Sequence, residues 1–125
     1  MKESASFWDA IDRLVASSRI VIRRPAGSRH PRYRDVTFLL DYGYLEGTTS
    51  PDGAGIDVWL GRGAGRTTTA AVVAIDLLKR DLETKILLSC TREDTAAIEA
   101  FHTTPFQQGW VISRPTSFPA APSET

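Results

Sequence analysis

The short spacing between its apolar, β-branched runs is the feature that most constrains the fold of this chain. Segments rich in glycine, proline, aspartate or threonine, which favour turns, separate most of these runs. Parallel neighbouring strands need a crossover of a dozen or more residues, and most of the connections are too short to hold a crossover helix. The pattern therefore predicts short strands joined mainly by turns, without a parallel sheet. The strands are expected at residues 19–24, 36–40, 56–60, 67–75, 85–90 and 110–114.

Helices are expected only near the two ends of the chain. Within residues 7–17 the apolar side chains recur at spacings of three and four, as on one face of an amphipathic helix, and Ser6 is a candidate N-cap. Thr91, followed three residues later by Asp94, resembles a capping box that would open a second helix over residues 93–102. Central strands with terminal helices indicate an α+β fold, and the short connections favour a small mixed β-barrel.

Length and composition indicate one folded domain. A chain of 125 residues has room for a single modest core, and 42% hydrophobic and 24% charged residues are ordinary for a globular protein. We expect one domain over residues 1–114 and a disordered tail, rich in proline, serine and alanine, over residues 115–125. The single cysteine, Cys90, excludes an internal disulfide and a multi-cysteine zinc site.

We expect neither a transmembrane helix nor a signal peptide. Its longest fully apolar run covers residues 70–75, far below the ~18 residues that a transmembrane helix needs. The apolar segment of a signal peptide does not follow Lys2. We expect a cytoplasmic protein with no membrane partner.

Charge is distributed unevenly, although 15 lysines and arginines balance 15 acids. Residues 19–34 contain six arginines and no acid, whereas residues 35–57 contain five acids and neither lysine nor arginine. Arginine binds phosphate through paired hydrogen bonds, so Arg29 and Arg32 of the first block are candidate phosphate ligands. The alternative is that this block is a solvated edge. The neutral total gives no reason to expect nucleic-acid binding.

Two aspartates are candidate ligands for a hard cation. Asp52 and Asp57 lie five residues apart around the end of residues 41–55, a segment expected to form turns and an ordered loop. The two carboxylates can converge on Mg²⁺, which takes a few carboxylate oxygens together with water and phosphate. Alternatively, Asp52 belongs to a turn and Asp57 only keeps a strand edge soluble.

A second group of charges surrounds an expected charged connection at residues 77–83. It can supply further metal ligands and a lysine directed at phosphate. The alternative is that these are plain surface charges. The group consists of Asp76, Asp81, Glu83 and Lys85.

The segment from residue 41 to residue 58, DYGYLEGTTSPDGAGIDV, resembles the active-site segment of soluble family I inorganic pyrophosphatases. In that family an Asn-Tyr-Gly-aromatic turn precedes a threonine-containing loop and then Asp-Gly-Asp-Pro-hydrophobic-Asp. The whole chain resembles a short bacterial subgroup of that name in its Phe-Trp opening, in Gly-Ser-Arg-His-Pro-Arg-Tyr and in Gly-Ile-Asp-Val-Trp. The resemblance implies a five-stranded OB-like barrel and Mg²⁺-dependent hydrolysis of pyrophosphate or another small phosphorylated ligand.

The resemblance also implies roles for individual residues. Asp52 and Asp57 match aspartates that bind the activating Mg²⁺ and hold the attacking water, and Tyr42 matches the tyrosine that orients this water. Arg32 stands where the family has a phosphate-binding lysine. A second acidic cluster with a lysine is similar in placement. The implied site has catalytic residues Asp57, Tyr42 and Asp52, phosphate ligands Arg32, Arg23, Lys85 and Arg29, and metal ligands Asp52, Asp57, Asp76 and Glu83.

Several positions depart from the family pattern, and three of these departures replace an acidic residue. Ala54 replaces the middle aspartate, which is usually assigned to the water-activating base, and Arg23 and Arg34 stand where the family has acids. Loss of one general base costs about 10²- to 10⁴-fold in rate. Two hypotheses stay open: a pyrophosphatase-like hydrolase with an altered or weakened site, and a catalytically inactive pyrophosphatase-fold protein that binds a phosphate-containing ligand.

Two further interpretations concern macromolecular partners. A barrel that binds single-stranded nucleic acid through the arginine block is disfavoured, because the total charge is neutral and acids lie beside the block. Self-association into a homo-oligomer is compatible with the apolar surface that Phe7, Trp8 and Trp110 offer.

Overall fold

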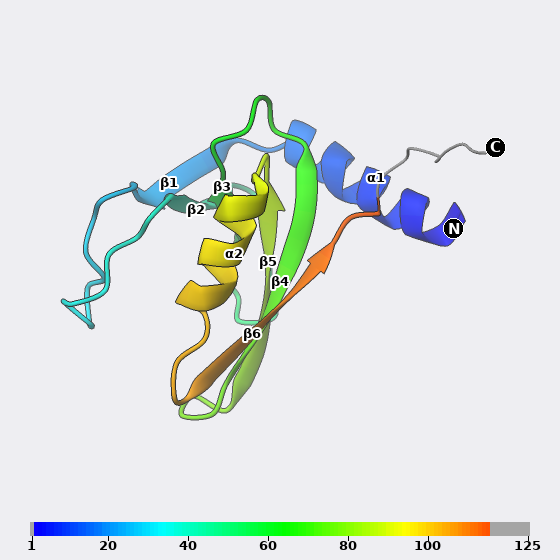
Figure 1. Ribbon diagram of the computed structural model, residues 1–125. Coiled ribbons are helices and arrows are strands. Elements are labelled where there is room, and N and C mark those ends of the chain that lie inside the picture. The colour runs from blue at the N-terminus through cyan, green and yellow to red at the C-terminus, as the bar shows by residue number, and fades with distance from the viewer. Residues whose placement is uncertain (1, 116–125) are drawn as a thin grey trace.

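The computed structural model describes residues 2–115, which form two helices and six strands (Figure 1). The α+β class is confirmed. Of the expected disordered tail, only Pro115 lies inside the described residues. The order is α1 (Lys2–Ala16), β1 (Ile20–Arg24), β2 (Asp41–Leu45), β3 (Ile56–Leu60), β4 (Thr68–Asp76), β5 (Asp81–Leu88), α2 (Arg92–Phe101) and β6 (Gln107–Ser113).

All six strands belong to one mixed sheet with the order β1-β2-β3-β5-β4-β6. The sheet is not closed, so the expected five-stranded barrel is not found over residues 2–115. The edge strand β6 gives the physical reason. The backbone N–H of Val111 donates to the Glu99 carboxylate of α2 at 2.9 Å, and the Gln107 N–H donates to the Thr104 carbonyl at 3.3 Å. Helix α2 and the turn after it thus cover the edge at which a barrel would continue.

One strand pair is parallel, β3 with β5, and the other four pairs are antiparallel. Strand β5 inserts between β3 and β4, so the connection at residues 61–67 crosses the end of β5. Gly61 and Gly63 in this connection donate backbone N–H groups to the carbonyls of Leu88 and Ser89 at 2.8 and 2.7 Å. The parallel pair therefore needs no crossover helix, because β4 carries the chain back along the sheet.

The side chains of the strands pack into two hydrophobic clusters, one on each face of the sheet. Adjacent residues such as Val58 and Trp59 fall in different clusters, because successive side chains of a strand point to opposite faces. The α1 cluster consists of Val15, Leu45, Val58, Ile86 and Leu88. The α2 cluster consists of Phe38, Leu40, Trp59, Ala70, Val72, Leu87 and Ile98. In Figure 1, α2 lies over one face of the sheet and α1 lies beside the start of β4.

The strands expected at residues 19–24, 56–60 and 67–75 are present as β1, β3 and β4, with bounds within about two residues of those expected. Strand β5 begins at Asp81, four residues before the expected start. It forms a long hairpin with β4 in which Asp76 pairs with Asp81. The expected charged connection at residues 77–83 is therefore a turn only over residues 77–80, and its last three residues are strand, because cross-strand pairing outweighs the low strand propensity of the acidic residues.

The apolar run at residues 36–40 is not a strand. A single bridge joins Thr37 to Arg29, and the buried side chains of Phe38 and Leu40 belong to the α2 cluster. Phe38 and Leu40 therefore pack between α2 and the sheet, although the run pairs with no neighbouring strand.

Residues 41–45 form strand β2, where turns and a loop are expected. Gly43 gives the reason for the difference. A Cβ atom at this position would collide with the backbone carbonyl of Val21 in β1. The glycine allows two strands to approach closely, which the sequence pattern does not distinguish from a turn.

Both predicted helices are present with shifted bounds. Helix α1 begins at Lys2, so Ser6 lies inside the helix and the N-cap prediction is wrong. Helix α2 begins after Thr91, whose hydroxyl accepts the N–H of Asp94 while the Asp94 carboxylate accepts the N–H of Thr91. The predicted capping box is therefore confirmed.

The aromatic residues near the chain ends differ in exposure. Trp8 is buried, whereas Phe7 and Trp110 are exposed. Trp8 therefore belongs to the interior and not to the apolar surface expected for self-association. Neither helix in residues 2–115 has the length and apolar character needed to cross a membrane.

Candidate functional site

Four polar side chains gather on the face of the sheet that α2 covers, where β2, β3 and β5 lie side by side. Tyr42 comes from β2, Asp57 from β3, and Glu83 and Lys85 from β5. We call these four residues the strand cluster. Tyr42 and Asp57 are diagonal neighbours across β2 and β3, and Lys85 lies beside Asp57 across the parallel pair. Strand register alone therefore brings together residues that are up to 43 positions apart in the sequence, from residue 42 to residue 85.

The strand cluster is connected by three short polar contacts. The Tyr42 hydroxyl donates to Asp57 Oδ2 at 2.8 Å, and the Lys85 ammonium donates to the same oxygen at 3.0 Å and to Glu83 Oε1 at 2.9 Å. The Lys85 side chain is only 7% exposed, whereas those of Asp57 and Glu83 are 25% and 29% exposed. Within residues 2–115, Asp57 Oδ1 accepts no hydrogen bond. This oxygen is available to a ligand from the solvent side.

Protonation in the strand cluster follows from burial and charge. Burial raises the pKa of Tyr42 above its usual value, so the phenol keeps its proton and donates to Asp57. Burial by itself lowers the pKa of Lys85, but its interactions with Tyr42 and Asp57 and its hydrogen bond to Glu83 outweigh burial and raise this pKa. Lys85 therefore stays cationic at neutral pH and cannot act as a general base.

Arg23 brings a further positive charge to the same face. Its guanidinium lies over the Tyr44 ring, 4.3 Å from the centroid, and Tyr44 pairs directly with Asp57. Arg23 lies at the register shift between Ile22 and Arg24 in β1. The local bulge explains how this side chain reaches the face of the strand cluster.

Asp52 lies in the loop that precedes β3, and its carboxylate is held by its own loop. The Ser50 hydroxyl and the Ala54 N–H both donate to Asp52 Oδ1. These hydrogen bonds lower the pKa of Asp52, to which the charge of Lys85 also contributes. Asp52 is therefore ionised at neutral pH and lies within the field of the strand cluster, but no hydrogen bond joins it to Asp57 in the described residues.

Asp76 lies apart from the strand cluster, at the turn between β4 and β5. Its carboxylate accepts the backbone N–H groups of Leu78 and Lys79, both at 2.9 Å. It also lines an open hollow of about 320 Å³ formed by the turn. Of the four expected metal ligands, the structure brings together Asp57 and Glu83, around the Lys85 ammonium.

The expected phosphate ligands Arg29 and Arg32 lie on a long loop between β1 and β2. We call residues 25–40 the arm. Both arginines are exposed, and in Figure 1 the arm projects beyond the ends of β1 and β2. Phe38 joins the base of the arm to the strand cluster, because its ring centroid lies 5.6 Å from that of Tyr42.

A buried contact between Trp59 and His102 supports the strand cluster, and it was not among the expected site residues. The Trp59 indole N–H donates to His102 Nε2 at 3.1 Å, and the Trp59 ring lies 4.7 Å from that of Tyr42. Burial lowers the pKa of His102 to about 4, with a smaller contribution from the charge of Lys85. His102 lies four residues after the buried Ile98, a spacing that would have indicated a residue facing the core.

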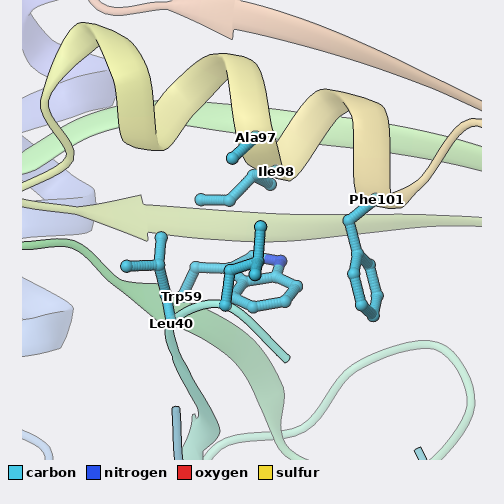
Figure 2. Close-up of a pocket in the computed structure, with 6 residues that line it drawn as sticks. Leu40, Trp59, Ala97, Ile98 and Phe101 are labelled. Carbon is cyan, nitrogen blue, oxygen red and sulfur yellow. The ribbon is translucent and has the colours of Figure 1, made fainter. Parts of the chain in front are cut away.

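A small apolar cavity lies between α2 and the sheet, beside Trp59. Figure 2 shows the side chains of Leu40, Trp59, Ala97, Ile98 and Phe101 gathered around it. Its volume of about 10 Å³ holds at most one water molecule. The cavity is therefore a gap in the core packing and not a ligand site.

The donor set fits a Mg²⁺ ion only if a ligand completes its coordination. Within residues 2–115, no group of three or more histidine, cysteine, aspartate or glutamate side chains is arranged to hold a metal ion. Mg²⁺ is commonly bound by one or two carboxylates together with water and substrate phosphates. The free oxygen of Asp57 fits this second mode, because it accepts no hydrogen bond within residues 2–115.

Comparison with known proteins does not assign the chain to a family. No protein-family model matches the sequence, and a search of curated proteins finds no significant match. The resemblance of residues 41–58 to family I inorganic pyrophosphatases therefore enters only as support for a proposal.

Proposed function

We propose that this protein is a Mg²⁺-dependent hydrolase of phosphoanhydride bonds, with pyrophosphate as the leading substrate. The observation that carries this function is the unequal hydrogen bonding of the two carboxylate oxygens of Asp57. One of its oxygens accepts hydrogen bonds from Tyr42 and Lys85, and the other accepts none in the described residues. The resemblance of residues 41–58 to family I inorganic pyrophosphatases supports the same activity, with the open sheet as a variant of their OB-like barrel.

The chain's own residues have separable tasks in this reaction. Tyr42 and Lys85 fix the orientation of the Asp57 carboxylate, whose free oxygen accepts a hydrogen bond from the attacking water. Arg23, on the same face, and Arg29 and Arg32, on the arm, bind phosphate oxygens. The water oxygen forms a bond to phosphorus as the bridging P–O bond breaks. The departing phosphate takes the electron pair and the proton that the water releases.

Magnesium would be held by Asp57 and Asp52 with phosphate oxygens and water. When bound, it would lower the pKa of water and neutralise charge on the phosphates. A lowered pKa of the attacking water is compatible with Ala54 at the position where family I inorganic pyrophosphatases carry a carboxylate base.

The second candidate is a protein that binds a phosphate-containing ligand without hydrolysing it. The observation that favours it is the ion pair of Asp57 and Glu83 with Lys85, in which one ammonium already offsets part of the negative charge of two carboxylates. Such a site needs less metal charge to accept an anion. It lacks the base that Ala54 has replaced.

Phosphate release from pyrophosphate in the presence of Mg²⁺ tests the proposed function. We expect turnover by the wild type and a loss of about 10²-fold or more in kcat/KM for Asp57→Asn. Glu93→Gln is the matched control, since Glu93 is an exposed acid on α2, and it should retain wild-type activity. Urea unfolding of Asp57→Asn shows whether the variant is folded.

Two outcomes decide between the candidates. Equal rates for wild type and Asp57→Asn, or no turnover by the wild type, would remove the hydrolase. A rise in Tm on addition of pyrophosphate, without turnover, would identify the binding protein instead.

A further inference from the structure

The arm has a defined backbone structure although it contains no strand. Near its base, the Gly27 N–H donates to the Phe38 carbonyl at 2.7 Å and the Phe38 N–H donates to the Ser28 carbonyl at 2.9 Å. Farther out, the His30 N–H donates to the Val36 carbonyl at 2.8 Å. The Asp41 carboxylate accepts the Ala26 N–H at 2.8 Å and holds the base. Only the tip, residues 31–35, lies beyond these cross-links.

A single imidazole organises that tip. His30 Nδ1 accepts two backbone hydrogen bonds, from Arg32 and from Tyr33, each at 3.1 Å. A ring nitrogen can accept hydrogen bonds only when it carries no proton, so this arrangement requires neutral His30. The imidazole lies 5.0 Å from the Tyr33 ring and stacks on Phe38 at 5.8 Å with an interplanar angle of 4°.

The groups around His30 favour its neutral form. Burial lowers the pKa of the imidazole, and the charges of Arg24 on β1 and Arg32 on the arm lower it further. The other ionisable group in contact with the ring is the Tyr33 phenol. The two backbone bonds therefore persist at neutral pH.

His30 also connects the arm to the strand cluster. Its ring stacks on Phe38, and Phe38 packs against Tyr42, whose hydroxyl donates to Asp57. A continuous row of aromatic contacts therefore runs from the tip of the arm to the carboxylate of the candidate site. The exposed guanidinium groups of Arg29 and Arg32 flank this row in the sequence.

We propose that His30 is a positioning residue for anion recognition: its unprotonated Nδ1 holds the tip of the arm in the shape that presents Arg29 and Arg32 to a diphosphate ligand. The inference rests on the proposed function only for the identity of the ligand. The arm then provides the affinity for the anion, whereas the strand cluster provides the groups for hydrolysis.

Four variants test this role, with pyrophosphate as the probe. His30→Ala removes the acceptor. His30→Asn keeps one, because an asparagine side chain bonds the backbone N–H two residues on without titrating. Arg32→Ala removes a presented charge, and Arg92→Ala is its matched control, an exposed arginine at the start of α2. The Kd for pyrophosphate with Mg²⁺ is measured by calorimetry, and KM and kcat by phosphate release.

We expect His30→Ala and Arg32→Ala to raise Kd and KM about tenfold. His30→Ala removes two hydrogen bonds that order the tip, and Arg32→Ala removes a direct contact with the anion. The kcat should stay within about twofold, since the strand cluster is untouched. His30→Asn should restore most of the affinity, and Arg92→Ala should match the wild type. This split between KM and kcat, with rescue by asparagine, is not produced by a general loss of stability.

The outcomes separate this inference from the proposed function. Unchanged Kd in His30→Ala, or a Kd for His30→Asn as weak as that for His30→Ala, would overturn the role of His30 while leaving hydrolysis intact. Binding without turnover would overturn hydrolysis and leave the role of His30 to be judged by Kd. No binding of pyrophosphate by the wild type would overturn both.

Discussion

The strand cluster and the arm hold charged side chains in two different ways. In the strand cluster, Lys85 contacts both Asp57 and Glu83 directly, and all three side chains are at least two-thirds buried, because the register of paired strands leaves them little freedom. In the arm, Arg29 and Arg32 are exposed and are held indirectly, through the backbone of the loop. Rigid contacts suit chemistry at a defined atom, whereas exposed charges on a shaped loop suit capture of a ligand.

A histidine with an unprotonated acceptor nitrogen supports each region. His102 Nε2 accepts the indole N–H of the buried Trp59, next to Tyr42 of the strand cluster. His30 Nδ1 accepts two backbone N–H groups in the arm. Because His102 is buried and His30 is only half-buried, acid should affect the two regions to different degrees.

The largest effect is expected from Lys85→Met, which breaks the strand cluster at its centre. The variant leaves the carboxylates of Asp57 and Glu83 facing each other without a cation. Removing one partner of a buried ion pair typically costs about 3–5 kcal/mol. Because the two acids are partly exposed, we expect the free energy of unfolding to fall by about 3 kcal/mol. Urea unfolding followed by tryptophan fluorescence measures this loss.

Lys79→Met is the control for the loss of a lysine. Lys79 is exposed and lies 4.0 Å from Asp81, so its substitution should change stability by less than about 0.5 kcal/mol. A Lys85→Met variant as stable as Lys79→Met would show that the three side chains of the strand cluster do not stabilise the sheet.

The second effect concerns acid and His102. The pKa of the imidazole is about 4 in the folded protein, against the ordinary histidine value of 6.5. As pH falls below 6.5 the unfolded chain takes up a proton that the folded protein does not. The free energy of unfolding should therefore fall by about 1.4 kcal/mol per pH unit, to a total loss of about 3 kcal/mol near pH 4.

His102→Gln provides the comparison, because a glutamine oxygen can accept the Trp59 N–H without titrating. Its stability should depend less on pH between 6.5 and 4 than that of the wild type. His30→Asn should change this profile less, because His30 is half-buried whereas His102 is buried. Identical pH profiles for His102→Gln and the wild type would contradict the buried, neutral state of His102.

The smallest effect is expected from Arg23→Met, at the junction between the two regions. The variant removes the cation–π contact with Tyr44, which at an exposed site contributes about 0.5 kcal/mol. Arg19→Met is the control, because Arg19 is exposed and makes only a weak ion pair of 3.7 Å with Glu46. Thermal unfolding of both variants gives the difference. A loss of several kcal/mol for Arg23→Met would mean that the arginine joins arm and sheet more tightly than one contact allows.

Local patterns predicted part of the fold well. The strand at residues 56–60 and the capping box at Thr91 and Asp94 are both present, because each depends on contacts within a few residues. The strand at residues 41–45 was missed. Gly43 is typical of a turn in the sequence pattern. In the structure it allows close approach to the backbone of Val21, which lies 22 positions earlier in the chain, from residue 43 back to residue 21.

The candidate site shows the same division. The resemblance to a known family pointed to Tyr42, Asp57, Glu83 and Lys85, which the structure brings together. It also pointed to Asp76, which caps a turn elsewhere. Sequence spacing does not separate the two cases, because an acid near the end of a strand can face a turn or a neighbouring strand.

Residue types and their spacing were sufficient for the α+β class, most strands, both helices and the separation of an arginine-rich block from an acidic one. These properties depend on interactions between near neighbours in the chain. Tertiary packing set the insertion of β5 between β3 and β4, the covering of the β6 edge by α2, and the partners of Asp57 and His102. Each of these depends on which strand lies beside which and in what register, and that follows from the burial of whole faces of the sheet.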